Sequence, residues 1–419
     1  MSFYTSLTGL NAAATELSVT SNNIANSGTT SFKRSDAEFG DIFASSSLQR
    51  AAVSTGSGTV LLGINQNFTQ GSIESSGNSL DLAVTGDGFF PIKTSDGSDL
   101  YTRNGGFMLN DSDLLVNGEG NLLQVHPLNP ATNESDFTQV TGDLEIKRDL
   151  PATPTTNVGL DIKLPMAGAA IVGVAGPILI NPADSATYNE KQTISLYDDA
   201  GEPYEATVYY QKTADDTDDG FGNIQDLWKA DIYIGNSAAP AGTTQIIFNS
   251  ASGAIFTPVA DLTIAASAAD SRTSNITLSL NAVSHGKGFQ IVSQTQNGLA
   301  SGALVNIDVG NDGLVTSTYS NGQQLVAGRI NLAKFNSPEG LRQDGGTKYS
   351  ATATSGVVSF GEPGSAGLGT ILSGALERSN VDLTAELIDL ISAQRNFQAN
   401  AKAIETSSSL TQTILNIRG

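Results

Sequence analysis

The sequence predicts a mainly β protein with α-helical termini, in which nested β-domains are attached to a terminal coiled-coil domain. Three observations support this fold class. Apolar residues at both ends of the chain recur at alternating spacings of four and three, which is typical of helices that pack along a seam. Between the ends, short apolar segments alternate with turn residues. Only 15% of the residues are charged and 44 of 419 are Gly, which favours turn-rich β-structure.

Residues 1–28 are predicted to form a helix with an apolar heptad seam. Ser21 takes the one polar place in this seam. Its apolar members are Phe3, Leu7, Leu10, Ala14, Leu17 and Ile24. The flanking residues are mostly Ser, Thr, Asn and Ala, so an isolated helix of this sequence is marginal in water.

Residues 379–419 are predicted to form a second helix with the same spacing. Ser379 followed by Asp382 resembles a capping box, which places the helix start near 379. Gln394, Ser408 and Thr411 fill the polar places of the seam. Its apolar members are Leu383, Leu387, Leu390, Phe397, Ala401, Ile404 and Leu415. The pattern leaves open whether the two termini pack within one chain or against other copies.

Between the helices, the pattern changes to that of β-structure. Residues 29–70, rich in Ser, Thr and Gly, are expected to be an extended linker. Residues 71–150 and 301–378 are expected to form an outer β-domain. Pro151 and Pro154 on one side and the Gly/Ser/Asn-rich stretch 297–302 on the other delimit an inserted distal β-domain, residues 151–300. Predicted strands include segments 80–84, 193–197, 206–210, 230–234 and 304–309.

The charge balance excludes several classes of protein. With 21 basic and 42 acidic residues, the net charge is −21, so neither nucleic acid nor an anionic membrane is an expected partner. The first cation is Lys33, so the N-terminus lacks the positive region of a Sec signal. The longest apolar stretch, residues 164–180, is interrupted by Pro and Gly, and we expect no membrane insertion.

The candidate chemical sites are weak. Asp215, Asp219 and Asp226 fit an EF-hand calcium loop incompletely, and a solvated acidic loop is the simpler interpretation. Cys is absent, and the two histidines, His126 and His285, occur in turn-like contexts without a nucleophile elbow. We therefore expect no catalytic, cofactor or metal site. A secreted calcium-dependent β-rich adhesin and a β-rich hydrolase are kept as alternatives.

Three blocks of distinctive sequence lie near the two termini and at the edges of the outer β-domain. The blocks are SLTGLNAA, VTSNNIAN and TSFK at 6–13, 19–26 and 30–33; LDLAVTGDGFF and YTRNGGF at 80–90 and 101–107; and LERSNVDLTAEL and ISAQRNFQAN at 376–387 and 391–400. The motif Asn22, Asn23, Ile24, Ala25 and Asn26 lies in the first block. Together and in this order, the three blocks resemble the bacterial flagellar axial proteins, the family of rod and hook subunits.

Within the family, the chain length, the large insertion and the segment RINLAKF at 329–335 are more similar to hook members than to rod members. A distal rod protein is the alternative. The resemblance implies a homopolymer that forms a curved hollow tube, a universal joint that transmits torque from rod to filament. The terminal helices are expected to form its inner layer.

The resemblance also implies binding partners and a location outside the cell. Rod proteins lie below the tube, hook–filament junction proteins lie above it, and a hook cap is present during assembly. The flagellar type III apparatus exports the subunit to the extracellular flagellum. Phe39 and Phe43 resemble the Phe-x-x-x-Phe pattern associated with the export gate, although two apolar anchors in a linker explain the same residues.

Overall fold

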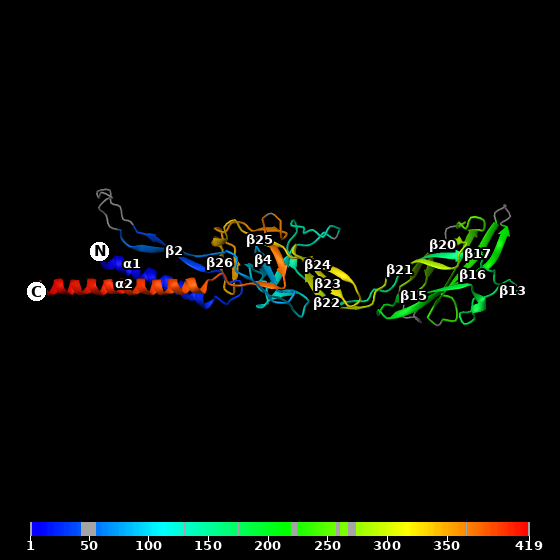
Figure 1. Cartoon of the computed structure of the whole chain (residues 1–419), viewed down its shortest axis with the longest axis horizontal. Coiled ribbons are helices and arrows are strands. Elements are labelled where there is room, and N and C mark those ends of the chain that lie inside the picture. The colour runs from blue at the N-terminus through cyan, green and yellow to red at the C-terminus, as the bar shows by residue number, and fades with distance from the viewer. Residues whose placement is uncertain are drawn as a thin grey trace. The chain divides into compact units, whose positions relative to one another are not determined.

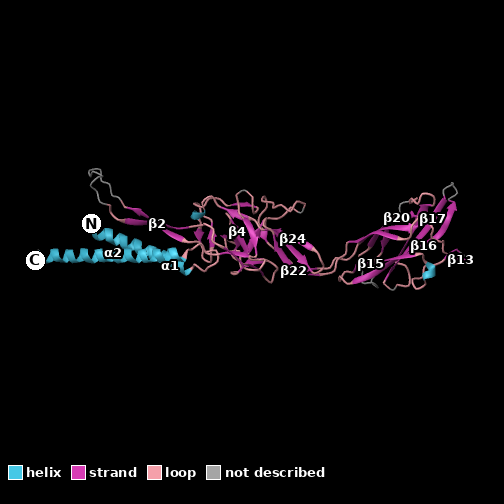
Figure 2. Cartoon of the chain, in the orientation of Figure 1, coloured by secondary structure: helices cyan, strands magenta, loops and turns pink. Residues whose placement is uncertain are grey.

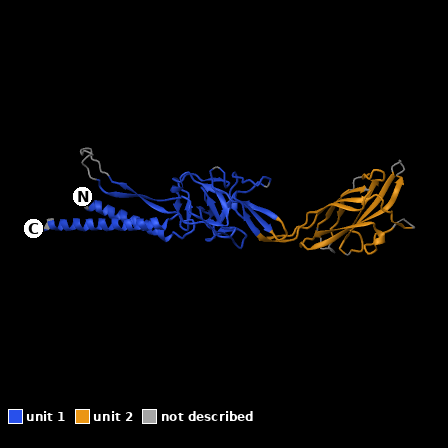
Figure 3. Cartoon of the chain, in the orientation of Figure 1, with its two compact units in different colours: residues 1–147, 306–318, 324–419 blue, residues 148–305, 319–323 orange. Residues whose placement is uncertain are grey.

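The computed structural model describes residues 2–42, 56–129, 131–173, 176–218, 224–235, 237–256, 260–266, 274–365 and 367–417 (Figure 1). Helices occur at the two ends of the chain and strands between them (Figure 2). The chain divides into two compact units (Figure 3). Unit 1 comprises residues 1–147, 306–318 and 324–419, and unit 2 comprises residues 148–305 and 319–323. Residues 151–300, expected to form the inserted domain, lie within unit 2.

Both helices belong to unit 1 and pack against each other. Helix α1 spans Ser2–Ala25 and helix α2 spans Leu383–Ile417. The Asn23 side chain reaches Glu386, whereas Gly9 lies against Asn400. Residue numbers rise along α1 while those of the contacting residues fall along α2, so the two helices are antiparallel.

The segment expected as an extended linker contains a β-hairpin. Strand β1 (Ser35–Asp41) pairs antiparallel with β2 (Thr59–Gln66), with an irregularity between Glu38 and Phe39. Thr8 of α1 accepts a hydrogen bond from the backbone of Thr59, so the hairpin is attached to the first helix. Sequence patterning does not reveal this hairpin, because Ser, Thr and Gly interrupt the apolar alternation in the segment that contains it.

The β-domain of unit 1 is built on a sheet in the order β26-β27-β6-β5-β9-β8-β7, with β10 paired to β9. Three two-stranded sheets adjoin it: β29-β4, β3-β30 and β25-β28. The strands before the insertion are β3 (Ile73–Ser75), β4 (Leu82–Thr85), β5 (Phe90–Lys93), β6 (Asp99–Thr102), β7 (Phe107–Leu109), β8 (Leu115–Asn117), β9 (Leu122–Val125) and β10 (Gly142–Asp143).

The chain returns to this domain after the insertion. Strand β22 (Gly302–Val309) begins in unit 2 and ends in unit 1, and β22, β23 and β24 are consecutive in one sheet. A 3-10 turn, Pro338–Gly340, follows β25. The strands after the insertion are β23 (Leu314–Tyr319), β24 (Gln324–Arg329), β25 (Leu332–Lys334), β26 (Arg342–Gln343), β27 (Lys348–Ser350), β28 (Ser359–Gly361), β29 (Thr370–Ser373) and β30 (Ala375–Glu377).

Aromatic rings form one core of unit 1. Phe89 contacts Phe68, Phe335 and Tyr349 edge to face, with ring centroids 5.5–6.0 Å apart. Tyr101 packs on Phe335 at 4.8 Å. These rings come from the segments that precede and follow the insertion in sequence, so the core holds both parts of unit 1 together.

Unit 2 is a β-sandwich. One sheet has the order β19-β20-β12-β21 and the other β15-β16-β17-β18, and β12 lies parallel to β20. The strands are β11 (Asp149–Leu150), β12 (Asn157–Pro165), β13 (Val172–Gly173), β14 (Gly176–Pro177), β15 (Glu190–Tyr197), β16 (Pro203–Asp218), β17 (Ile224–Ile234), β18 (Gly242–Asn249), β19 (Leu262–Ile264), β20 (Ile276–His285) and β21 (Gln290–Gln296); Ser185–Thr187 form a 3-10 turn.

Alternate residues of both sheets point into one core. Buried and less buried positions alternate along β12 and β15, as expected when one face of each strand is covered. Trp228, the only tryptophan of the chain, is 1% exposed in this core. Its fluorescence therefore reports on the unfolding of unit 2.

The mainly β fold class with helical termini is confirmed. Four of the five predicted strand segments lie wholly within strands, and segment 80–84 overlaps β4 at residues 82–84. None of the helices among the described residues combines the length and the apolar content needed to cross a membrane.

Candidate assembly interface

The contact between α1 and α2 is made by small and polar side chains. Ala13 and Thr20, seven residues apart, are buried on α1, and Glu386 and Ala393, also seven apart, are buried on α2. A β-carbon added at Gly9 would lie 2.7 Å from the Asn400 side chain. Small residues at these positions allow the two helices to approach closely.

The contact therefore runs one residue out of phase with the predicted seams. Positions 14, 21, 387 and 394 are exposed, whereas 13, 20, 386 and 393 are buried. Among all predicted apolar seam residues, seven are half-buried and five are exposed. The half-buried ones are Leu7, Leu10, Leu17, Ile24, Leu390, Ala401 and Ile404, and the exposed ones are Phe3, Ala14, Leu383, Leu387 and Phe397. The side chain of Leu415 lies outside the described residues.

Apolar side chains are left on the outer surface of both helices. On α2 the exposed fractions are 46% for Leu387, 60% for Ile388 and 50% for Ile391. Phe3 and Tyr4 of α1 are exposed, as are Val60 and Leu62 of the hairpin. Contiguous exposed apolar surface on a soluble chain marks an interaction site.

The start of α2 differs from the prediction. A cap at Ser379 was expected, but the helix begins at Leu383. The Asp382 carboxylate accepts hydrogen bonds from the backbone N–H groups of Thr384 and Ala385, at 2.8 and 3.2 Å. Asp382 is thus the N-cap, because only its side chain reaches the first free N–H groups of the helix.

We expect Asp382→Ala to destabilise the first turn of α2 by about 1 kcal/mol, because two helical N–H groups lose their acceptor. Hydrogen exchange of the amides of Thr384 and Ala385 measures this loss. Ser379→Ala is the matched control, and equal effects of the two substitutions would contradict the assignment of the cap.

Asn23 of the family motif anchors the end of α1. Its side chain is 1% exposed and exchanges two hydrogen bonds with the backbone of Ser35, at 2.8 and 3.0 Å. It also donates to Glu386 at 3.3 Å. Asn22 accepts from the Asn26 side chain, while Ile24 is half-buried and Ala25 is the last helical residue.

Arg34 completes this contact between α1, α2 and the hairpin. Its Nε lies 2.7 Å from Glu386, as an ion pair rather than an aligned hydrogen bond. Its Nη2 lies 3.0 Å from Asp36 and 3.5 Å from Asp389. One arginine thereby forms ion pairs with carboxylates of both β1 and α2.

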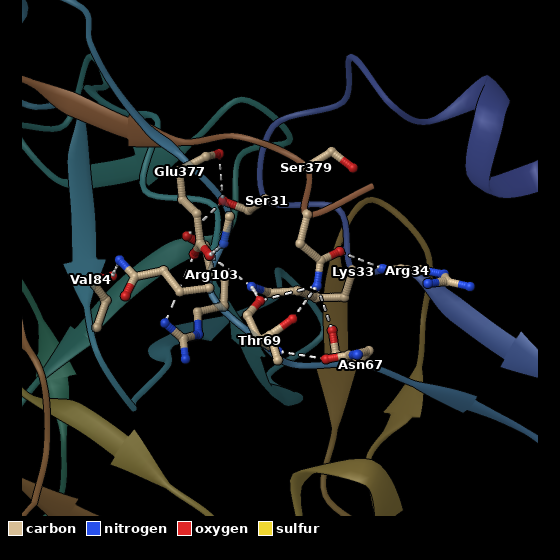
Figure 4. A network of polar contacts seen from close by, with 12 residues as sticks. Ser31, Lys33, Arg34, Asn67, Thr69, Val84, Arg103, Glu377 and Ser379 are labelled. Atoms are coloured by element: carbon tan, nitrogen blue, oxygen red, sulfur yellow. Dashed lines mark hydrogen bonds and ion pairs between the residues drawn. The ribbon is translucent and has the colours of Figure 1, made fainter. Parts of the chain in front are cut away.

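A second, more deeply buried network joins the two helix ends to the β-domain (Figure 4). Lys33 and Glu377 form an ion pair of 2.7 Å, and both side chains are fully buried. Lys33 also donates to the carbonyl of Thr69, and the Glu377 carboxylate accepts from the N–H of Gly71, both at 2.8 Å. Arg103 lies 3.9 Å from the other carboxylate oxygen.

Neighbouring backbone contacts extend this network. The N–H of Ser31 donates to the carbonyl of Glu377 at 2.8 Å, and its hydroxyl donates to the carbonyl of Arg103. Asn380 accepts from the N–H of Arg34 and donates to Asn67 and Thr69. We call Ser31, Lys33, Arg103, Glu377 and Asn380 the junction.

Burial dominates the electrostatics of the junction. Removal from water lowers the pKa of Lys33 below its usual 10.5, and the attraction of Glu377 opposes this shift. Burial likewise lowers the pKa of Arg103, and Glu377 and Asp87 oppose it. Both cations lie near the same carboxylate, whose attraction offsets part of the cost of burying them.

The junction residues were not among the predicted site residues. Each one nevertheless lies in a sequence block that carried the family resemblance. Lys33 is also the first cation in a stretch with few charges. A lone charge within such a block was the available signal, but it gives no indication of a partner 344 positions away.

Phe39 lies in β1, half-buried and opposite Leu61. Phe43, the other residue of the possible export motif, lies outside the described residues.

The acidic segment of unit 2 is a bulged strand pair rather than an EF-hand loop. Carboxylate oxygens of Asp215, Asp216 and Asp226 lie within 4.8 Å of one another. The buried ammonium of Lys212 lies 2.5 Å from Asp215 and 3.3 Å from Asp226, so a protein cation already forms ion pairs with two of the three carboxylates. Asp219 lies outside the described residues.

His126 is a buried structural residue of unit 1. Its ring packs on Phe137 and Phe360, and its Nδ1 lies 3.1 Å from the carbonyl of Gln139. Among the described residues, no serine hydroxyl is hydrogen-bonded to it. His285 ends β20, and its side chain lies outside the described residues.

Four family models match the chain. They are the flagellar basal body rod protein at residues 3–33, the flagellar hook protein FlgE/F/G D1 domain at 83–168, the flagellar basal body protein FlaE D2 domain at 166–299 and the flagellar basal body rod FlgEFG protein C-terminal region at 372–417.

Whole-chain comparisons agree. Flagellar hook protein FlgE of Escherichia coli K12 is 36% identical, with 100% of both chains covered. The protein of the same name from Brucella suis is 31% identical, covering 99% of this chain and 98% of the relative. The crystal structure of Helicobacter pylori flagellar hook protein FlgE2 has a similar fold, with a TM-score of 0.51 at 15% identity, covering 71% of this chain and 98% of that one.

Proposed function

Because this chain belongs to the bacterial flagellar hook protein family, we propose that its terminal helices form the inner layer of a tubular homopolymer. The chain is a structural subunit of the flagellar hook. The tube is hollow and curved, and it acts as a universal joint that transmits torque from rod to filament. The observation that carries the proposal is the apolar surface that α1 and α2 leave exposed after they have paired with each other.

Burial of this surface supplies the free energy of association. Leu383, Leu387, Ile388 and Ile391 lie on successive turns of α2 and are each 46–60% exposed. Apolar burial contributes about 25 cal/mol per Å². A head-to-tail contact that does not close into a ring produces a helical filament. The seam residues outside the cis contact therefore contact neighbouring copies.

The specific partners follow from the family and are part of the proposal. The hook contacts rod proteins below and hook–filament junction proteins above, and a hook cap directs its growth. The flagellar type III apparatus exports the subunit, with Phe39 and Phe43 as the segment that the export gate recognises. The role is structural rather than enzymatic.

Removal of both helices should abolish assembly and preserve both β units. In a chain reduced to residues 29–378, the Lys33–Glu377 pair and the sandwich core are retained, while the seams are absent. We expect electron microscopy of the concentrated full chain to show curved tubes, and the shortened chain to remain monomeric with a cooperative melting transition. Tubes formed by the shortened chain would contradict the proposal.

A further inference from the structure

Four asparagines of the chain are followed by glycine, the neighbour that leaves an asparagine side chain most open to attack by the next backbone nitrogen. Glycine has no β-carbon to shield its amide nitrogen, and its backbone turns easily. The four pairs are Asn104–Gly105, Asn117–Gly118, Asn297–Gly298 and Asn321–Gly322. All eight residues belong to the part of the chain that the structure describes, so their surroundings can be compared.

In three of the pairs, local contacts hold the glycine in place. Gly298 is buried, and its N–H donates to the glutamine side chain two residues earlier. The N–H of Gly322 donates to the carbonyl three residues earlier, at 3.0 Å. Gly105 is buried, and a β-carbon added to it would overlap the carbonyl oxygen of Leu82. These peptides cannot turn toward the preceding side chain without breaking a hydrogen bond or disturbing the packing.

The glycine of the fourth pair is unrestrained. Gly118 follows β8 in the turn to β9 and is exposed. Among the described residues its N–H has no acceptor. A β-carbon added to Gly118 would meet no atom within 4 Å. Its nitrogen can therefore approach the Asn117 side chain at little cost.

The Asn117 amide is oriented for this attack. Its Oδ1 accepts hydrogen bonds from the backbone N–H groups of Glu119 and Asn121, at 3.1 and 2.9 Å. Attack on Cγ places negative charge on Oδ1, and these two donors stabilise that charge where it develops. In the described part of the chain Nδ2 makes no hydrogen bond, so none has to break when it leaves.

We propose that Asn117 is a site of spontaneous deamidation in the folded chain. The Gly118 nitrogen loses its proton and bonds to Cγ of Asn117; the Cγ–Nδ2 bond breaks, and the NH₂ group leaves with a proton as ammonia. The product is a five-membered succinimide. Water then adds to one of its two carbonyl carbons, and the bond from that carbon to the ring nitrogen breaks. Addition at Cγ gives aspartate, and addition at the main-chain carbon gives isoaspartate.

The two products should affect the turn differently. The aspartate carboxylate still accepts from Glu119 and Asn121, now through charge-assisted hydrogen bonds. Isoaspartate adds one carbon to the main chain, at the residue whose N–H donates to the carbonyl of Asn121 at 3.0 Å. The turn between β8 and β9 is therefore preserved in the first product and interrupted in the second.

Incubation of the full chain at mildly alkaline pH, followed by peptide mapping with mass spectrometry, tests the proposal. In the folded chain we expect Asn117 to deamidate at least about tenfold faster than the other three asparagines, because those must first open locally. In urea the four sites should react at similar rates. Gly118→Ala should slow the reaction at Asn117 about tenfold, because a β-carbon shields the attacking nitrogen. Gly28→Ala, at another exposed glycine with open space around it, is the matched control and should change nothing.

Three results would overturn the proposal. Equal rates at the four sites of the folded chain would show that the fold does not select Asn117. An unchanged rate in Gly118→Ala would show that the Gly118 nitrogen is not the attacking group. Aspartate without any isoaspartate would exclude the succinimide, because its hydrolysis produces both.

Discussion

Leu387→Asp should abolish tube formation and leave the monomer folded. Leu387 is 46% exposed on α2 in the single chain, so an aspartate there is solvated and tolerated. In the assembled seam the same carboxylate is buried without a partner, at a cost of several kcal/mol for each subunit. Light scattering and electron microscopy measure assembly, and circular dichroism of the dilute protein measures folding.

Two further substitutions distinguish contacts between copies from contacts within one chain. Gln398→Asp, on an exposed position of α2 outside the predicted seam, should assemble normally. Ala393→Asp places the charge in the fully buried contact with α1 and should reduce helicity even in the monomer. If Leu387→Asp and Gln398→Asp assembled alike, the outer face of α2 would not be an interface.

Lys33→Met should destabilise unit 1 by about 3–5 kcal/mol, because it leaves the buried Glu377 carboxylate without its closest cation. Glu377→Gln should have a similar effect through the unpaired ammonium of Lys33. The double variant should recover much of the loss, because neither charge then remains buried. Thermal denaturation followed by far-ultraviolet circular dichroism measures all three variants.

Trp228 supplies an internal control for this experiment. It lies in the core of unit 2, so the midpoint of its fluorescence transition should stay unchanged in the three variants. A shift of that midpoint equal to the shift seen by circular dichroism would mean that the two units unfold together. Additive losses in the double variant would show that Lys33 and Glu377 do not interact.

The sequence located both helices but did not specify how they contact each other within one chain. The 4-3 spacing located α1 and α2, because helical periodicity is a local property of the chain. It placed Ala14 and Leu387 in the seam, one residue from the buried Ala13 and Glu386. Patterning assigns apolar residues to the interior, but the buried positions of this contact are small side chains and a carboxylate that is ion-paired with Arg34.

The junction could not be predicted from local patterns. Lys33 and Glu377 meet across 344 positions, and charged residues are normally expected at the surface. Similarly, Asp382 rather than Ser379 caps α2, because the choice depends on where the chain leaves the junction at Asn380. Long-range contacts set these details, and a single sequence does not report them.

The junction also determines how mechanical force passes through the subunit. Ser31 and Lys33 follow α1 and Glu377 and Asn380 precede α2, so a pull on either helix enters the β-domain at one place. Because the Lys33–Glu377 pair links the segment after α1 to the segment before α2, tension on one segment also acts on the other. Separating a helix from the β-domain requires several buried bonds to break together, rather than one after another. Force on a helix is therefore carried by the buried contacts of the junction as well as by the backbone.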